Sequence, residues 1–301
     1  MPVTSPPDHR GEVLCVGELL WDALPAGLFL GGAPFNVACH LRAAGAAVTM
    51  VTRVGADQLG DEARRRVARF GVSTDLLQVD ASLPTGFVRV SVADDGTAAY
   101  DILEPAAWDN LETTSALLHR AAAAQAVVFG TLAQRNGVTR NTLRRMLDTR
   151  ALKVLDVNLR PPYDDREIIR DALRRADVVK LNEEEMRRLA SWFDLRGDLP
   201  RTVAMLAETF RCRTVCVTRG PHGAALWRHG RWSEHPGFEV EVRDTVGSGD
   251  AFLAVLLAGL LNGIDDDALL DHANLIGAYV ATQHGAVPAD LPAHEPPLAR
   301  P

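Results

Sequence analysis

The chain has 301 residues, of which 47% are hydrophobic and 24% are charged, and its formal net charge is -7. This composition is ordinary for a globular protein, and the acidic balance argues against nucleic acid or an anionic membrane surface as a partner. The longest apolar stretch, residues 251–261, is shorter than the roughly 20 residues that span a bilayer. Because residues 1–11 also lack the apolar segment of a signal peptide, we expect a cytoplasmic protein.

Short β-branched runs alternate along the chain with amphipathic segments. In chain order, the expected elements are strand 13–17, helix 34–44, strand 48–54, helix 57–70, strand 127–131, helix 138–149, strand 153–158, helix 164–175, strand 178–182, helix 183–192, helix 200–210, strand 214–218, strand 224–228, helix 249–261 and helix 266–283. Several of these strands are continuously apolar, as in a parallel sheet covered by helices on both faces. The alternation predicts an α/β fold with a doubly wound, mostly parallel sheet flanked by helices.

Residues 85–104 break this alternation. They are predicted to form two strands around Asp94-Asp95-Gly96, a turn sequence that suits a hairpin. No helical segment follows directly, so we expect the hairpin to stand off the main sheet as a cover. The proline-containing ends, 1–10 and 291–301, are expected to be tails of a single domain that spans residues 11–290.

The cysteines and lysines exclude several classes of site. The four cysteines lie in apolar runs without a C-x-x-C pair, which predicts buried reduced thiols. The two lysines, Lys153 and Lys180, do not follow glycine, so the chain has no Walker A loop. The protein-kinase signatures and H-E-x-x-H are absent. Gly247-x-Gly249 lacks the third glycine of a dinucleotide-binding motif.

Polar side chains gather where the predicted strands end. Asp156, Asn158 and Arg160 follow one strand, and Asn182 and Glu185 follow the next. A further polar and glycine-rich segment, 218–223, follows a third strand. Since ligands bind outside the carboxyl ends of the strands in an open parallel sheet, these residues indicate a binding site.

The most informative segment runs from Asp244 to Asp250. Gly247 and Gly249 flank Ser248, and an apolar helix begins at once, so backbone N–H groups and the helix dipole converge on one point. Such a point suits a phosphate in transfer. Asp250 beside it has the position of a base that accepts the proton of an attacking hydroxyl. The alternative is that Ser248 or Asp250 only caps the helix.

A second glycine pair, Gly31-Gly32, precedes the helix expected at 34–44. Asn36 in its first turn has donors and an acceptor that can bind adjacent sugar hydroxyls. Asp22 lies upstream, in what we expect to be an irregular segment, where its carboxylate can accept hydroxyl protons. Taken alone, Asn36 also fits an exposed first-turn residue, and Asp22 a turn residue.

In this order and spacing, the motifs resemble those of the ribokinase-like (PfkB) family of carbohydrate kinases, and of its fructokinase branch in particular. The resemblance covers residues 13–288. It is carried by Gly17-Glu18, the glycine pair with Asn36 at 31–36, the segment 54–60, Thr85-Gly86, the segment 156–160, Asn182 with Glu185, and the signature at 244–250.

The resemblance implies roles for the matched residues. Asp250 is the implied catalytic base, and the backbone of Gly247, Ser248 and Gly249 the implied anion hole. The residues implied to bind the sugar or the phosphoryl group are Asp22, Gly32, Asn36 and Arg160. Those implied to border the nucleotide are Asn182, Thr218, Gly220, Gly223, Gly247, Gly249 and, near the adenine, Asn274.

The resemblance also implies ions and a lid. Asn182 and Glu185 would hold Mg²⁺, through water because magnesium keeps much of its hydration. Taken by its position alone, Glu185 also fits a solvated helix carboxylate. Asp244 is implied to belong to a potassium-binding loop. The segments 18–32 and 84–105 correspond to the family's lid, through which a homodimer is expected.

Two features depart from the family pattern or qualify it. Val246 replaces a commoner threonine and removes one side-chain oxygen near the expected potassium loop, and Ser248 replaces a commoner alanine. Arg89 on a lid strand is unusual for a kinase of a neutral sugar. It fits either a residue that binds a substrate carboxylate or a side chain that points to water.

We therefore expect ATP-dependent phosphorylation of a small sugar, as in a fructokinase acting on a primary hydroxyl of a hexose. One alternative is a kinase of an acidic sugar such as ketodeoxygluconate, with Arg89 as the reader of the carboxylate. The other is a non-catalytic regulator that binds sugar or nucleotide. Asp250, Asn182 and Glu185 argue against the regulator.

Overall fold

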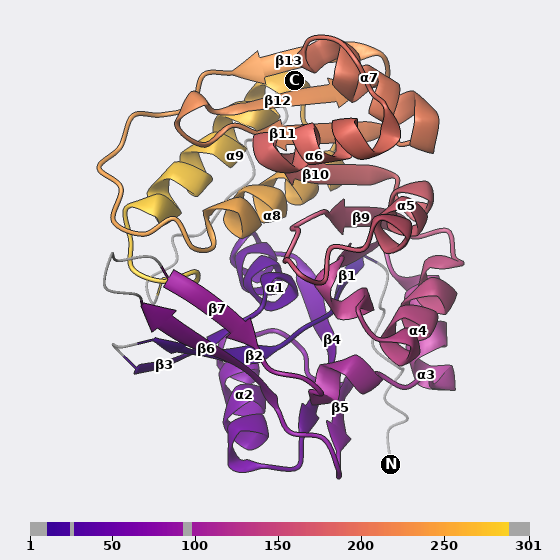
Figure 1. Ribbon diagram of the computed structural model, residues 1–301, viewed down its shortest axis with the longest axis vertical. Helices are drawn as coiled ribbons and strands as arrows, with labels where there is room; N and C mark the ends of the chain where they lie inside the picture. The colour runs from indigo at the N-terminus through magenta and orange to yellow at the C-terminus, as the bar shows by residue number, and fades with distance from the viewer. Residues whose placement is uncertain (1–10, 25–26, 93–97, 289–301) are drawn as a thin grey trace, which may run out of the picture.

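The computed structural model describes residues 11–24, 27–92 and 98–288 (Figure 1). A nine-stranded sheet forms its centre, with the strand order β13-β12-β11-β10-β9-β8-β1-β4-β5. Its strands are β1 (Glu12–Val16), β4 (Ala47–Gly55), β5 (Leu77–Asp80), β8 (Ala126–Gly130), β9 (Leu152–Asp156), β10 (Val178–Asn182), β11 (Thr214–Thr218), β12 (Ala224–Arg228) and β13 (Arg231–His235). Neighbouring strands from β11 to β5 in this order pair in parallel. Strand β12 pairs antiparallel with both β11 and β13. The predicted doubly wound, mostly parallel sheet is confirmed.

Helices cover both faces of this sheet. They are α1 (Ala33–Ala43), α2 (Gln58–Arg69), α3 (Ser115–Ala123), α4 (Gly137–Leu147), α5 (Arg166–Arg175), α6 (Glu183–Phe193), α7 (Leu199–Phe210), α8 (Ser248–Leu261) and α9 (Asp266–Ala281). Because side chains alternate along a strand, β1 contributes to two cores. Val13 and Cys15 pack with α1, α2, α8 and α9, whereas Leu14 and Val16 pack with α3 to α7.

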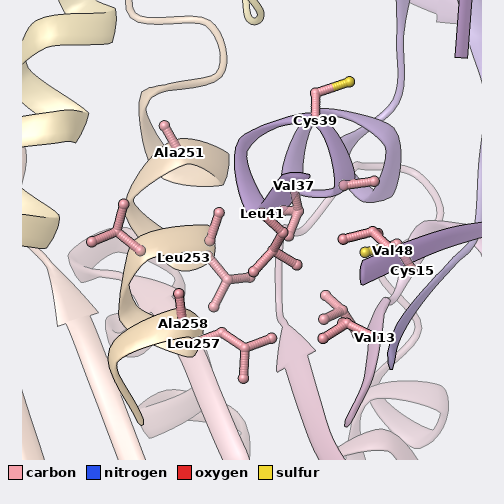
Figure 2. Packing of buried hydrophobic residues seen from close by; sticks show 14 of the residues in the cluster. Val13, Cys15, Val37, Cys39, Leu41, Val48, Ala251, Leu253, Leu257 and Ala258 are labelled. Carbon is pink, nitrogen blue, oxygen red and sulfur yellow. The ribbon is translucent and has the colours of Figure 1, made fainter. Parts of the chain in front are cut away.

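The core under α8 fixes the relative position of two helices that matter for the site. Residues 251–259 of α8 are all buried, which explains why this helix is apolar on every side. In Figure 2, Leu41 of α1 lies between Leu253 and Leu257 of α8 on one side and Val13 of β1 on the other. Close packing of this kind holds the first turns of α1 and α8 at a fixed separation.

A second, small sheet has the order β3-β2-β6-β7 and consists of β2 (Leu20–Leu24), β3 (Gly27–Gly31), β6 (Gly86–Val92) and β7 (Ala98–Ile102). Strands β6 and β7 pair antiparallel, as the predicted hairpin requires. Its expected turn, Asp94-Asp95-Gly96, lies outside the described residues, as do the expected tails 1–10 and 291–301.

The expectation of an irregular segment around Asp22 is wrong. Asp22 lies in β2, which pairs with β3 on one side and with β6 on the other. The indole Nε1 of Trp21 donates to the carbonyl of Leu59 at 3.1 Å, so β2 is also anchored to α2. These pairings join segments far apart in the sequence, and a five-residue strand shows too little alternation to reveal them.

Four further strands and helices were not expected from the sequence. They are β3, α3, the four-residue strand β5 and the polar edge strand β13. The four cysteines are buried and free, as expected. Among the described residues, no helix is both long enough and apolar enough to cross a bilayer.

The strand order reverses at β1, which has β4 and β5 on one side and β8 to β11 on the other. At such a reversal, the connections leave the sheet in opposite directions and open a crevice at the carboxyl ends of the strands. The starts of α1 and α8 lie at this end of the sheet, next to the small sheet (Figure 1).

Candidate active site

The start of α8 forms one half of the candidate site. Gly247 is the N-cap, with φ at 81°, and a Cβ there would lie 2.4 Å from Cα of Ala286. Only glycine combines this backbone conformation with this close approach. The sequence alternative of a side-chain cap is wrong, because no side chain in the described part of the chain caps this helix. The Ser248 N–H donates to the carbonyl of Thr245 at 3.3 Å. The N–H groups of Gly249 and Asp250 have no partner within the helix and remain available to an anion.

Asp250 connects this helix start to that of α1. Asn36 Nδ2 donates to Asp250 Oδ2 at 2.8 Å, across 214 residues of sequence. Asn36 is buried, so it is not the exposed first-turn residue that its position alone allowed. Its Oδ1 has no partner among the described residues and remains able to accept a hydrogen bond.

The electrostatic environment of Asp250 makes it a weaker acid than usual. Its pKa is raised to about 6, because burial and the Asp156 carboxylate, which raise it, outweigh Lys180, Asn36 and Arg160, which lower it. The carboxyl therefore has a higher proton affinity than an exposed aspartate but is still ionised at neutral pH. These are the properties of a general base that takes a proton from a hydroxyl group.

The second half of the site lies between β2 and α1. The pKa of Asp22 is raised to about 6, because burial outweighs the nearby Arg160, which lowers it. The pKa of Glu18 is raised to about 7, because burial and the Asp250 carboxylate raise it more than Arg160 lowers it. These interactions place the Arg160 guanidinium near three carboxyl groups. Gly32 has φ at 115°, and a Cβ there would lie 2.4 Å from the carbonyl oxygen of Glu18, so glycine is required where β3 enters α1.

Arg89 is not part of this group. Its side chain on β6 is 68% exposed and lies 3.8 Å from the Asp101 carboxylate on β7. Of the two interpretations of Arg89, this position fits the side chain that points to water.

A cavity of about 720 Å³, which Asn36 does not line, adjoins the start of α8. Its volume suits a ligand of nucleotide size. The residues implied to border a nucleotide that line it are Thr218, Gly220, Gly223, Gly249 and Asn274. Ser248 lines it too, so the cavity reaches the N–H groups of the helix start. Asn274 is buried, and its Nδ2 donates to the carbonyl of Leu270 at 2.7 Å.

Asn182 and Glu185 form a capping box at the start of α6. Asn182 Oδ1 accepts from the Glu185 N–H at 2.8 Å, and Glu185 Oε2 accepts from the Asn182 N–H at 2.8 Å. Glu185 Oε1 also accepts from the Leu159 N–H at 2.8 Å. The sequence alternative of a solvated carboxylate is wrong, because Glu185 is only 6% exposed. The reciprocal hydrogen bonds turn its side chain back over the helix start.

These contacts decide which kind of metal site fits. Each side-chain oxygen of Asn182 and Glu185 already accepts one backbone N–H. A carboxylate or amide oxygen has a second lone pair, which can accept from a metal-bound water. The pair therefore fits a hydrated Mg²⁺ held through water. No group of three metal-ligating side chains occurs among the described residues.

Asp244 braces the loop before α8. Its Oδ1 accepts from the Val246 N–H and its Oδ2 from the Gly285 N–H, both at 3.0 Å. His40 Nε2 lies 2.9 Å from the carbonyl oxygen of Ala286, the residue that contacts Gly247. Asp244 therefore has a structural role in this loop, and its role toward potassium stays a prediction.

Sequence reasoning missed Lys180. Its Nζ lies 3.1 and 3.2 Å from the two carboxylate oxygens of Asp156. A Cβ on Gly249 would lie 2.9 Å from the same Nζ. One signal was present, since Lys180 is a charged residue inside an otherwise apolar strand of a chain with two lysines. That Lys180 lies beside the start of α8 could not be predicted from the sequence.

Comparison with known proteins agrees with this site. A family model for the pfkB family carbohydrate kinases matches residues 26–293. The chain is 30% identical over 303 residues to a fructokinase of Klebsiella pneumoniae, covering 93% of this chain and 96% of that protein. It is also 30% identical over 302 residues to a fructokinase of Escherichia coli, covering 92% and 95%. The structure of a Xylella fastidiosa fructokinase with bound ATP has a TM-score of 0.80 at 25% identity, covering 92% of this chain and 94% of that one.

The fold, the site and these similarities define a carbohydrate kinase, a phosphotransferase with an alcohol group as acceptor. The chain belongs to the pfkB family of carbohydrate kinases. The resemblance inferred from the sequence motifs is confirmed.

Proposed function

We propose that this enzyme transfers the γ-phosphoryl group of ATP to a primary hydroxyl of a hexose, as a fructokinase does. The observation that carries the proposal is the hydrogen bond from Asn36 to Asp250. It puts a base between the sugar-binding start of α1 and the anion-binding start of α8. The similarity to two fructokinases and to a fructokinase structure with bound ATP supports the same substrates.

In the proposed reaction, the sugar hydroxyl lies within hydrogen-bond reach of Asp250. The carboxylate accepts its proton as the oxygen attacks the γ-phosphorus in line with the leaving ADP oxygen. The N–H groups of residues 247–249 and the helix dipole stabilise the charge on the transferred group. Since phosphoryl transfer is mainly a matter of positioning and electrostatics, the two helix starts provide most of what the reaction requires.

The nucleotide is proposed to occupy the cavity lined by Thr218, Gly249 and Asn274, with its phosphates toward Ser248. A bound Mg²⁺ would neutralise charge on the β- and γ-phosphates. Asn182 and Glu185 would hold the waters of that ion through their free lone pairs. A reaction that uses ATP is consistent with an enzyme of the cytoplasm.

Asp22, Gly32, Asn36 and Arg160 are proposed to form the sugar site. A neutral sugar suits it better than an acidic one, because two carboxyls, Glu18 and Asp22, already interact with the guanidinium of Arg160. A substrate carboxylate would add like charge to this group. Arg89, paired loosely with Asp101 on the surface, does not supply the missing cation.

We further propose a homodimer through the small sheet. Leu28 and Phe29 of the edge strand β3 are 46% and 43% exposed, although both are large and apolar. They are successive residues of a strand and point to opposite faces. An edge strand, which pairs on one side only and carries apolar side chains on both faces, is a surface to which a second chain can add.

The experiment for the proposed reaction is a coupled assay of ADP release with ketoses, aldoses, sugar acids and nucleosides at equal concentration. We expect the highest kcat/KM with a ketohexose, and phosphorus-31 NMR of the product to show a primary phosphate ester. The variant Arg89→Leu should keep the wild-type KM for that sugar. Preference for a sugar acid together with a raised KM in Arg89→Leu would replace this proposal by the acidic-sugar alternative. ADP release with none of the compounds would favour a non-catalytic regulator.

A further inference from the structure

Lys180 is a buried cation that the proposed reaction does not yet use. It lies on β10 and is only 7% exposed. Burying an ammonium group is costly unless anions compensate it. Asp156 on the neighbouring strand β9 does so in part, with both carboxylate oxygens within 3.2 Å of Nζ.

The position of the ammonium group relative to α8 is specific. A Cβ on Gly249 would lie 2.9 Å from Lys180 Nζ and 3.7 Å from Lys180 Cε. The backbone of Gly249 does not have a positive φ, so an alanine would suit the helix itself. What the absent side chain leaves room for is the ammonium group, directly beside the first turn of α8.

This placement puts two positive groups together, because the start of a helix already carries a partial positive charge. The arrangement is favourable only when anions face both. Lys180 interacts electrostatically with the carboxylates of Asp156, Asp250 and Glu185. The transferred phosphoryl group, at the N–H groups of the same turn, would be a further anion within this field.

The charged groups around Asp250 come from several elements. Glu18 follows β1, Asp156 and Arg160 lie on β9 and after it, and Lys180 lies on β10. Asp156 and Glu18 disfavour the ionised form of Asp250, and Arg160 and Lys180 favour it. Of the two cations, Arg160 is exposed and Lys180 is buried, so the attraction of Lys180 is screened less by solvent.

We propose that Lys180 is a positioning residue of the transfer, whose ammonium group keeps Asp250 ionised and adds positive charge beneath the N–H groups that receive the phosphoryl group. This inference rests on the proposed function, in which Asp250 is the base. It also explains why residue 249 is a glycine, since any side chain there would occupy the space that the ammonium group fills.

The first test replaces the charge and keeps most of the volume. In Lys180→Met, the side chain ends where Cε of lysine lies, so the site loses its cation. We expect kcat to fall about 10- to 100-fold with less than a threefold change in the KM of the sugar. The acid limb of the pH profile of kcat/KM should move to higher pH, because Asp250 loses the cation that lowers its pKa. Where the single variant folds poorly, Lys180→Met/Asp156→Asn removes both charges of the pair. Its kcat should fall as in the single variant, but its acid limb should not move to higher pH, because Asp156 raises the pKa of Asp250. An unchanged kcat in the double variant would contradict the proposal.

The second test uses the contact with Gly249. Gly249→Ala should displace the ammonium group and lower kcat by a similar factor, whereas in the Lys180→Met background it should cost little. A Cβ at 249 then meets only the position of Cε, at an ordinary 3.7 Å. Non-additive effects are expected from two changes that remove one interaction. Effects that multiply would contradict the proposed contact.

A readout without turnover separates this inference from the proposed function. Carbon-13 NMR of labelled aspartate carboxyls, with Asp250 assigned by the signal lost in Asp250→Asn, gives the pKa of Asp250 directly. We expect that pKa to rise in Lys180→Met even if no sugar tested is a substrate. An unchanged pKa and an unmoved acid limb would overturn the role of Lys180. A wild type that phosphorylates no sugar would instead overturn the proposed function.

Discussion

Asp250 combines two requirements at the scale of a single residue. As the proposed base, it must be close enough to the N–H groups of α8 to deprotonate an attacking hydroxyl there, and it must stay ionised although partly buried. The Asn36 hydrogen bond at 2.8 Å and the nearby cations meet the second requirement. The cost is a carboxylate whose ionised form is less favourable in the folded protein than in water.

Replacing Asp250 by asparagine tests both its proposed role in catalysis and the effect of its ionisation on stability. We expect kcat to fall about 10²- to 10⁴-fold, as for the loss of a general base, while calorimetry still detects ATP binding. Because burial raises the folded pKa above the ordinary 3.8 to about 6, ionisation weakens the fold as pH rises through that window. Asp250→Asn removes this penalty, so its melting temperature at pH 8 should equal or exceed that of the wild type. Near-normal turnover would show that another group is the base.

The same pKa sets the pH dependence of the wild type. The base must be ionised, so kcat/KM should fall as pH decreases through about 6. Asp22 has a pKa of about 6 as well and is the matched control. In Asp22→Asn the acid limb should persist, with a higher KM for the sugar, if Asp250 is responsible. Loss of the limb in Asp22→Asn would assign it to the sugar site.

At the scale of elements, the loop before α8 is held in place by residues 285–286, His40 and Asp244. Gly247 packs against Ala286, whose carbonyl is held by His40, and Asp244 holds the Gly285 N–H. These three contacts hold the loop before the helix begins. The sequence motif indicated that an anion would bind here. It gave no sign of residues 285–286, because this support comes from a segment about 40 residues further along the chain.

Gly247→Ala should lower both activity and stability. The substitution costs about 1 kcal/mol for the left-handed backbone alone, and the Cβ would also lie 2.4 Å from the Ala286 Cα. We expect kcat to fall at least tenfold, because the N–H groups move with the loop. Gly263→Ala is a matched control, since Gly263 follows α8 with φ at 70° and nothing within 4 Å of its Cβ position. It should lose stability only and keep kcat. Equal kcat in the two variants would contradict the importance of this loop.

At the scale of the whole molecule, periodicity and motif order were enough to predict the mostly parallel sheet, except its edge strands β5 and β13, and the segments that form the candidate site. Each of these depends on local signals, such as the continuously apolar strands and the glycine pairs before α1 and α8. What could not be predicted depends on contacts between distant segments. Asp22 lies in a strand because β2 pairs with both β3 and β6. The Glu185 carboxylate can be buried because it accepts a hydrogen bond from the Leu159 N–H, which comes from another part of the chain. The proximity of Lys180 to the start of α8 likewise depends on a contact between two segments that are far apart in the sequence.

The small sheet gives the last prediction, which concerns assembly. Leu28 of β3 pairs with Ala23 of β2, whereas Phe29 pairs with Asp22 and so shares the face of the carboxylate proposed to bind the sugar. Leu28→Lys therefore changes the face opposite the proposed sugar site. We expect light scattering after size-exclusion chromatography to give twice the chain mass of 32.6 kDa for the wild type and a lower mass for Leu28→Lys. Charge on an exposed edge strand opposes pairing with a second chain.

Val138→Lys provides the control for this experiment. Val138 is 45% exposed, almost the same as the 46% of Leu28, but it lies on α4 and not on the small sheet. The substitution should leave the mass unchanged. A wild type that stays at the mass of one chain across the concentration range, or an equal shift in both variants, would exclude the small sheet as the dimer surface. With a dimer confirmed, a higher KM for the sugar in Leu28→Lys at low protein concentration would follow, because β2, which carries Asp22, is paired directly to the edge strand that the partner covers.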